Sequence, residues 1–527
     1  MTSAAAATTP RAGRREWIGL AVIALPCLLY SMDLTVLNLA VPQISADLRP
    51  SSTEQLWIVD IYGFMVAGSL ITMGTLGDRI GRRRLLLIGA AAFGVASVLA
   101  ALSTTPAMLI ATRALLGVAG ATLAPSTLSL IRNMFLDPAQ RTVAIGVWVT
   151  SFSVGGAIGP LLGGVVLQYF SWGSVFLLGV PVMLLLLAVG PLLLPEFRDP
   201  DAGRLDVFSA ALSLVAVLLA IYGLKRIAAD GPGWAAALAI VAGVLAGVAF
   251  VGRQRGLDDP LIDLRLFHSR AFRASLITYL IGCLVSFGVY IFISQYLQLV
   301  LGLPPLQAGL WMVPSMVAFV VASMLVPPLA RRVPPARLVT AGLVVGAMGF
   351  AVLTLIDRQS GLTALVVGSV LYSLGIAPVV ILATDMIVGS APPERAGAAS
   401  AISETSAELG GALGIAILGS IGTAVYRHMM IDAIPPGVPS EAAASARSTL
   451  GGAVAAAERL AGAGGIELMH AAREAFVRSF QLTAAITAAI SLATAVAAAI
   501  MLRPDGTGTG AAENSNVVGA DEAATPG

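Results

Sequence analysis

The sequence predicts an all-α membrane protein with fourteen transmembrane helices, and three observations support that fold class. Of the 527 residues, 57% are hydrophobic and only 11% are charged, with a mean hydropathy of +0.89. A soluble surface needs far more polar side chains than this. Apolar runs of about 20 residues, the length that crosses a bilayer as a helix, recur along the chain. The basic residues, finally, gather in alternate connections between these runs.

The apolar runs define the predicted helices in order, and each is long enough to cross the hydrocarbon core of a bilayer. They cover residues 17–41, 55–76, 84–103, 106–131, 142–168, 172–194, 206–224, 233–252, 273–300, 306–328, 336–356, 362–389, 397–425 and 477–502. The first run follows three arginines, as in a signal peptide, but it is longer than a signal peptide's apolar region. We therefore expect it to remain as the first membrane helix.

The distribution of basic residues predicts the sidedness of the chain. The N-terminus, the even-to-odd connections and the end of the last helix carry 21 basic residues, whereas the opposite short loops carry 4. By the positive-inside rule, both termini then lie in the cytoplasm. The net charge is only +2, which gives no indication of a nucleic-acid partner. Cys27 and Cys283 have no motif around them and the three histidines are scattered, so we expect no metal site and no cofactor.

A weak internal repeat suggests two pseudo-equivalent bundles. LGDRIGRRRL begins at Leu76 and LARRVPPARL at Leu329, where six helices, two inserted helices and six more would place them. The predicted organisation is a disordered N-terminus over 1–14, a six-helix bundle over 15–200, inserted helices 7 and 8 over 201–255, a second six-helix bundle over 265–503 and a disordered tail over 504–527.

The segment 427–476 is predicted to lie outside the membrane on the outer side. Its helix-favouring stretches, 441–460 and 466–476, are separated by AGAGG. Two readings follow: a helical hairpin with these stretches as its arms, or a loop without regular structure.

Small residues dominate the stretch GVWVTSFSVGGAIGPLLGG in the fifth predicted helix. In lipid, such a face marks a close approach between helix backbones, and the proline gives the helix a place to bend. A close-packed helix pair in any membrane protein would explain part of this pattern. The whole pattern resembles the antiporter motif of major facilitator superfamily exporters, and its positions are Gly146, Gly155, Gly159, Pro160, Gly163 and Gly164.

Other stretches resemble the same superfamily. The cytoplasmic signature between helices 2 and 3 is similar to GTLGDRIGRRRLLL, which begins at Gly74. The resemblance implies that Asp78 and Arg79 belong to a charge network. Asp78 can meet an arginine or a helix N-terminus across the bundle interface. MDLTVLNLAVP in helix 1 and RALLGVAGA from Arg113 extend the likeness to the drug:proton antiporter family with fourteen helices. The second cytoplasmic signature departs from the family pattern at Pro334 and Pro335.

Few ionisable side chains lie inside the predicted helices. At the centre of a membrane each costs about 2.5 to 3.5 kcal/mol on insertion scales, so each is a functional hypothesis by default. They are Asp33, Asp60, Arg113, Asp385, Glu404 and Glu408.

The resemblance places Asp33 of helix 1 in a central cavity. A low-dielectric environment disfavours the charged form of a carboxyl group, so Asp33 can hold a proton and lose it when a cation arrives. The alternative is a buried structural pair with Arg113 of helix 4, within the same charge network.

Glu404 and Glu408 are one turn apart on helix 13 and therefore face the same side. Two carboxyl groups this close cannot both ionise cheaply, so their protonation is coupled and a cation can displace a proton. Alternatively, one faces the cavity and the other is satisfied at a helix interface. Asp60 and Asp385, near the outer end of helix 2 and the inner end of helix 12, can line the cavity or lie at the membrane surface.

Aromatic rings can bind a flat cation through their faces. Aromatic residues at helix ends more often anchor a helix at the membrane surface than bind a ligand. The candidate substrate contacts are Trp148, Tyr290 and Trp311.

The resemblance implies a proton-coupled multidrug efflux antiporter of the bacterial inner membrane. It would export lipophilic cations, such as quaternary ammonium compounds and dyes, by alternating access, and we expect a monomer whose partners are cationic drugs, protons and lipid. Alternatives are an exporter of an endogenous or neutral antibiotic, a proton-coupled uptake carrier, or a membrane scaffold without transport. The Gly146 to Gly164 motif argues against uptake, and the sequence has no Walker loop for an ATP-driven pump.

Overall fold

The computed structural model describes residues 11–50, 52–198, 206–231, 233–257, 260–357, 361–460 and 463–502, and within these ranges the regular structure is helical, without strands. Most of the predicted disordered N-terminus, 1–10, and the whole predicted tail, 504–527, lie outside the described residues.

The first half of the chain, which we call the N half, contains the helices up to Leu193. They are α1 (Arg14–Leu48), α2 (Ser52–Ile80), α3 (Arg82–Ala101), α4 (Pro106–Gly120), α5 (Leu123–Met134), α6 (Pro138–Tyr169), α7 (Ser174–Leu177) and α8 (Gly179–Leu193). The starts of α4 and α6 follow from capping chemistry, because Thr105 accepts a hydrogen bond from the Met108 amide and Asp137 one from the Gln140 amide. A proline occupies the first position of both helices, where its missing N–H costs nothing.

Two inserted helices and a second group of helices, the C half, follow. The inserted pair is α9 (Val207–Asp230) and α10 (Trp234–Gln254). The C half consists of the 3-10 turn η1 (Leu264–His268), α11 (Arg270–Gln295), the π turn η2 (Tyr296–Val300), α12 (Pro305–Ala330), α13 (Pro335–Leu353), α14 (Gly361–Gly389), the 3-10 turn η3 (Pro393–Arg395), α15 (Ala396–Ala433), α16 (Ser440–Ser448), α17 (Leu450–Arg459) and α18 (Ala463–Met501).

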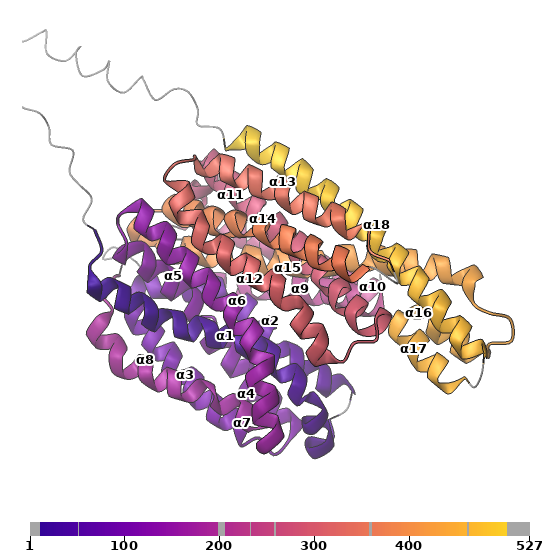
Figure 1. The fold of residues 1–527 in the computed structure, drawn as a ribbon. Coiled ribbons are helices and arrows are strands. Elements are labelled where there is room, and N and C mark those ends of the chain that lie inside the picture. The colour runs from indigo at the N-terminus through magenta and orange to yellow at the C-terminus, as the bar shows by residue number, and fades with distance from the viewer. Residues whose placement is uncertain are drawn as a thin grey trace, which may run out of the picture.

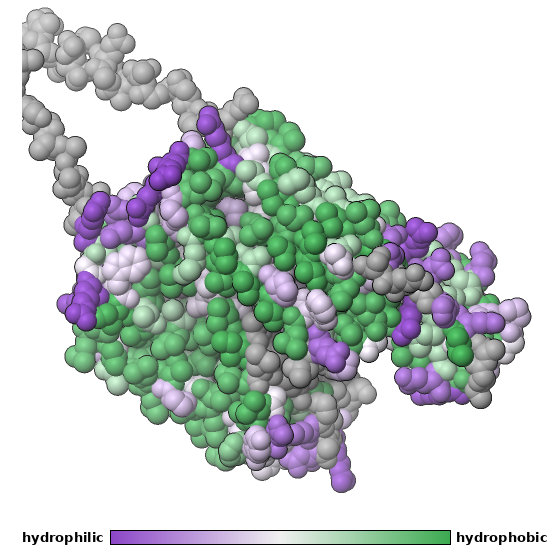
Figure 2. All heavy atoms as spheres, viewed as in Figure 1, coloured by the Kyte–Doolittle hydropathy of each residue, from purple (hydrophilic) through white to green (hydrophobic). Residues whose placement is uncertain are grey.

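The predicted membrane crossings are present. Among the described residues, thirteen helical segments are long and apolar enough to span a bilayer, and the 32-residue α6 covers the remaining predicted run. The fourth predicted helix is divided into α4 and α5, and the sixth into α7 and α8. Polar residues gather at the two ends of the molecule, with a broad apolar surface between them (Figure 2). The fold class predicted from composition and hydropathy is therefore confirmed.

The helices form two bundles that meet along one seam (Figure 1). Helix α9 packs against α2 of the N half and α15 of the C half, so the inserted pair covers the seam on one side. The beginning of α1 and the end of α18 lie at the same end of the molecule, which we call the terminal end, and α16 and α17 project at the opposite, far end (Figure 1).

The far-end segment is helical, and its helices have other bounds than the two stretches predicted from the sequence. The stretch 441–460 forms both α16 and α17, because Thr449 interrupts the helix and caps α17 by accepting a hydrogen bond from the Gly452 amide at 3.0 Å. The stretch 466–476 is the first part of α18. No glycine or proline follows Gly465 before the end of α18, and the far-end stretch and the apolar span form one helix.

Two hydrophobic cores show how the halves are joined. The larger core combines N-half residues with C-half residues from the terminal-end parts of their helices, including Val326, Leu338, Leu382, Ala396 and Ala498. The second core, at the far end, draws its members from α11 onward, including Val289, Phe350, Tyr426 and Phe480. Apolar packing thus closes the seam at the terminal end, whereas the C half has its own core at the far end.

Candidate transport site

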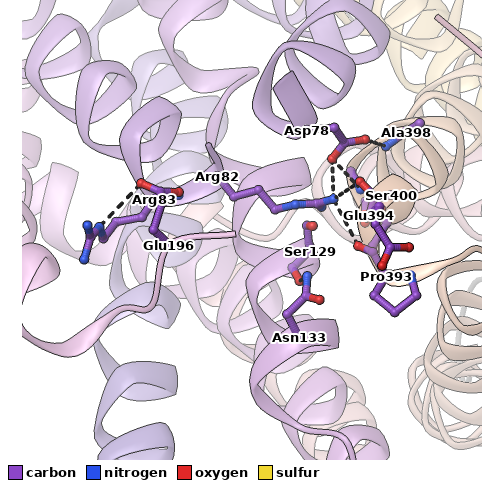
Figure 3. Close-up of polar contacts among 12 residues, drawn as sticks. Asp78, Arg82, Arg83, Ser129, Asn133, Glu196, Pro393, Glu394, Ala398 and Ser400 are labelled. Carbon is purple, nitrogen blue, oxygen red and sulfur yellow. Dashed lines mark hydrogen bonds and ion pairs between the residues drawn. The ribbon is translucent and has the colours of Figure 1, made fainter. Parts of the chain in front are cut away.

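Asp78 joins the two halves at the terminal end. It lies in the last turn of α2, and its two carboxylate oxygens accept hydrogen bonds from the Gly397 amide at 3.2 Å and the Ala398 amide at 3.1 Å (Figure 3). These amides belong to the first turn of α15, where helix N–H groups have no partner within the helix and the helix dipole favours an anion. Asp78 therefore acts as an N-terminal cap supplied by the opposite half.

Arg82 extends this contact. It pairs with Asp78 and donates hydrogen bonds to the Glu394 carbonyl at 2.8 Å and the Pro393 carbonyl at 3.3 Å (Figure 3). Close backbone approach requires glycine here, since a Cβ on Gly74 would lie 2.6 Å from the Gly397 carbonyl oxygen. The sequence GTLGDRIGRRR is thus a clamp between α2 and the start of α15.

An ion pair also joins the two halves at the same end. The Arg141 Nε of α6 lies 2.6 Å from Asp385 Oδ1 of α14, and the Thr142 hydroxyl donates to Asp385 Oδ2 at 2.8 Å. Asp385, which the sequence left either in the cavity or at the membrane surface, is therefore part of the contact between the halves.

Asp33 forms a buried ion pair within the N half. Its Oδ2 lies 2.9 Å from Arg113 Nη1, with 8% of Asp33 and 1% of Arg113 exposed. The other two guanidinium nitrogens also donate, Nε to the Ile58 carbonyl at 2.9 Å and Nη2 to the Val59 carbonyl at 3.3 Å. The guanidinium lies over the Tyr62 ring, 5.0 Å from its centroid. A buried charge pair needs such additional hydrogen bonds to offset its desolvation.

Glu404 and Glu408 lie on α15 near the seam. The Oε1 atom of Glu404 is buried and has no hydrogen-bond partner among the described residues. The Oε1 atom of Glu408 accepts a hydrogen bond from the hydroxyl of Tyr30, on α1 of the opposite half, at 3.3 Å. An unpartnered buried carboxyl oxygen is costly, so this site is suited to a proton or a positively charged ligand.

The other sequence candidates are distributed around these two sites. Asp60 is half-buried on α2, next to Val59. Trp148 is enclosed in the N half, where its indole N–H donates to the Thr127 hydroxyl at 2.9 Å. Tyr290 and Trp311 are half-exposed on α11 and α12.

The glycine motif of α6 contacts helices of both halves. A Cβ on Gly155 would overlap the Leu28 carbonyl of α1, and one on Gly146 would lie 3.2 Å from the Ser323 carbonyl of α12. Gly159 and Gly163 are buried, whereas Gly164 has open space around it. The side chain of Pro160 is not among those that the structure describes. The motif therefore allows α6 to pack closely on α1, the helix that carries Asp33.

Sequence reasoning missed Tyr30 as a site residue. It precedes Asp33 by three positions and therefore shares a helix face with it, and this spacing could have identified it. Nothing in the sequence indicated that Glu408 of the other half would be its partner.

Two helical bundles, clamped at one end and carrying buried carboxyl groups near their seam, are the architecture of a polytopic membrane transporter. Residues 23–415 match the model of the Major Facilitator Superfamily, and the chain belongs to that superfamily.

Relatives support the same assignment. The chain is 45% identical to the multidrug efflux pump LfrA of Mycolicibacterium smegmatis, over 91% of this chain and 95% of that protein. It is 35% identical to the methyl viologen resistance protein SmvA of Salmonella typhimurium (88% and 94%) and 32% identical to the tetracenomycin C resistance and export protein of Streptomyces glaucescens (91% and 91%). The resemblance to multidrug exporters seen in the sequence is confirmed.

Solved structures confirm the fold. The human organic anion transporter MFSD10 matches with a TM-score of 0.60 at 16% identity, over 92% of this chain and 99% of that chain. The fucose:proton symporter FucP of E. coli matches with a TM-score of 0.57 at 12% identity, over 92% and 99%.

Proposed function

We propose that the protein is a proton-coupled multidrug efflux antiporter that exports lipophilic cations, such as quaternary ammonium compounds and cationic dyes, by alternating access. The observation that carries this proposal is the carboxyl pair Glu404 and Glu408 near the seam, with Tyr30 of the other half bonded to one of them. Relatives named for multidrug efflux and for resistance to methyl viologen, a dication, support the substrate class.

The exchange follows from charge repulsion. Two carboxyl groups one turn apart cannot both be negative at low cost, so at least one holds a proton while the site is empty. A lipophilic cation supplies the positive charge that makes the ionised form favourable, and the proton leaves. Asp33 can contribute only when its contact with Arg113 loosens, because that guanidinium already neutralises it.

Electrical work indicates why more than one acidic group is useful. Moving one positive charge outward against an inside-negative potential costs about 2.3 kcal/mol per 100 mV. One proton entering per monovalent cation leaving cancels this charge movement, while a second proton would add the electrical driving force. A dication needs two protons for the same balance, and Glu404 with Glu408 supplies two positions.

The packing supports assignment of this conformation to the outward-facing state. By the positive-inside rule the terminal end, with its clusters of arginine, faces the cytoplasm. The Asp78 clamp, the Arg141 to Asp385 ion pair and the larger core all close that end. The carboxyl pair would then exchange protons with the outer side. We place the protein in a bacterial inner membrane, as a monomer with both termini in the cytoplasm.

Reconstituted vesicles test the proposal. The full-length protein in proteoliposomes should move protons in response to ethidium, and Glu404→Gln, Glu408→Gln and Asp33→Asn should each reduce that flux. Glu467→Gln on α18 and Asp432→Asn on α15 are matched controls, because both side chains are exposed at the far end. Ethidium transport without any proton movement contradicts the proposal.

A second candidate is export of a neutral or endogenous antibiotic. The 32% identity to a tetracenomycin C export protein favours it. Transport of such a compound that persists in the Glu404→Gln and Glu408→Gln variants would identify this function.

A further inference from the structure

One hydrogen bond between the halves lies away from the clamp. The contacts made by Asp78, Arg82 and Arg141 are at the terminal end, whereas Tyr30 and Glu408 lie well inside α1 and α15. Tyr30 is 6% exposed, and its hydroxyl donates to Glu408 Oε1 at 3.3 Å. This bond therefore depends on how the two halves are placed at the depth of the carboxyl pair.

The Tyr30 ring connects this bond to the other acidic site. Its centroid lies 6.1 Å from that of Tyr62 and 5.5 Å from that of Phe152, the latter edge to face. Tyr62 in turn lies beneath the Arg113 guanidinium, which pairs with Asp33. A continuous series of packed groups thus leads from Glu408 to the buried ion pair of the N half, and such a series can carry energetic coupling between two sites.

We propose that Tyr30 is a positioning residue for the exchange, which holds the Glu408 carboxylate from the opposite half and links its protonation to the Asp33 and Arg113 pair. This inference rests on the proposed function, since it assigns Tyr30 to the same site. A phenol O–H that donates to a carboxylate favours the charged form of that carboxylate. Movement of α1 away from α15 removes the donor, and Glu408 then favours a proton. Rocking of the halves and proton binding are coupled in this way.

Other titratable groups lie within electrostatic reach of Glu408. They are Tyr62 of α2, Tyr279 and Cys283 of α11, and Glu404 of the same helix. Tyr30 differs from these in joining Glu408 through a hydrogen bond from α1. A test must therefore separate the hydroxyl of Tyr30 from the general charge environment.

Binding of ethidium to the purified full-length protein in detergent, measured by fluorescence polarisation against pH, makes that separation. Tyr30→Phe keeps the ring and removes the hydroxyl, so the pH of half-maximal binding should rise by about one unit, the size expected for one hydrogen bond to a charged group. The shift should persist in the Glu404→Gln background and vanish in the Glu408→Gln background. Tyr222→Phe is the matched control, because its hydroxyl accepts a hydrogen bond from Arg226 of the same inserted helix.

A second variant keeps the inference testable if Tyr30→Phe does not fold. Site-specific 3-fluorotyrosine at position 30 keeps the ring and makes the hydroxyl a stronger donor, so the pH midpoint should fall. Three results would overturn the inference. The pH midpoint could equal that of the wild type in both variants, the shift caused by Tyr30→Phe could survive in the Glu408→Gln background, or ethidium binding to the wild type could be independent of pH. The proposed function stands on a different readout, the ethidium-driven proton flux of the wild-type protein in proteoliposomes, so the two failures are distinguishable.

Discussion

In the N half, the buried carboxylate of Asp33 is neutralised by an arginine of the same half. In the C half, Glu404 has no such ion pair among the described residues. Asp33 Oδ2 lies 2.9 Å from Nη1 of Arg113, whose other two guanidinium nitrogens donate hydrogen bonds to backbone carbonyls. Glu404 has a buried oxygen without a hydrogen-bond partner among the described residues, and its neighbour Glu408 receives a hydrogen bond from the other half.

A buried charge can stabilise a bundle or change its protonation state during transport, and the two halves differ in this respect. A carboxylate with a local arginine keeps one charge state, so it contributes mainly to the structure of its bundle. A carboxyl group that depends on a proton, a ligand or the opposite half for its stability can change state during transport. We therefore expect loss of the N-half partner to affect stability first, and loss of the C-half acids to affect transport first.

Removal of Arg113 should have the largest effect. Arg113→Met leaves Asp33 buried without its partner, which typically costs about 3 to 5 kcal/mol. The thermal unfolding midpoint of the purified protein should fall accordingly. The double variant Asp33→Asn, Arg113→Met should recover part of the loss, because it removes the uncompensated charge. If Arg113→Met unfolds at the wild-type temperature, the ion pair is not a structural element of the N half.

The C-half acids should show the opposite pattern. Replacing both Glu404 and Glu408 by glutamine removes the charge that attracts the cation. Since a hydrogen bond to a charged group is worth about 1.5 to 3 kcal/mol, ethidium-driven proton flux should fall by about tenfold or more. The unfolding midpoint should stay near that of the Glu467→Gln control, because neither variant leaves a buried charge. Loss of stability with flux intact would reverse the comparison.

The clamp at the terminal end should have an intermediate effect. Asp78→Ala removes the cap on α15, and loss of a helix cap costs about 0.5 to 2 kcal/mol. Because this cap joins the halves, the terminal end should open more often, and a cysteine introduced at the exposed Ser390 should react faster with a membrane-impermeant maleimide. Asp137→Ala is the matched control, since Asp137 caps α6 within its own half. Equal labelling rates in both variants would argue against the clamp.

The smallest effect is expected at an ion pair outside the membrane core. Asp206 caps α9, and hydrogen bonds from Arg253 and Ser209 hold its pKa below the usual range. A lowered pKa stabilises the folded state above the pKa of the unfolded chain, near 4, and this stability is lost as the pH falls through the lower folded value. Asp206→Asn should therefore change the unfolding midpoint slightly at pH 7 and not at all in strong acid. A larger difference in acid than at pH 7 would contradict this sign.

Much of the architecture was determined by the sequence itself. Hydrocarbon demands helices of about 20 apolar residues, and the chain contains fourteen such runs, so hydropathy alone predicted the fold class. Glycine spacing similarly predicted a close helix contact at Gly155, because backbone approach depends on the local absence of a side chain, whereas the close contact at Gly74 came only from the structure. At the far end, helix propensity predicted helical stretches, and α17 packs on α18, but propensity did not indicate the break at Thr449 or that residues 466–476 belong to the same helix as the last membrane span.

Tertiary structure decided which charges meet. Asp33 and Arg113 are 80 residues apart, Tyr30 and Glu408 are 378 apart, and Asp78 and Ala398 are 320 apart. A sequence identifies residues that are costly in lipid, but the partner that offsets this cost is set by the packing of whole helices across the seam. For that reason the same residue type, a carboxylate in a membrane helix, is part of an ion pair at Asp33, a clamp at Asp78 and a candidate exchange site at Glu408.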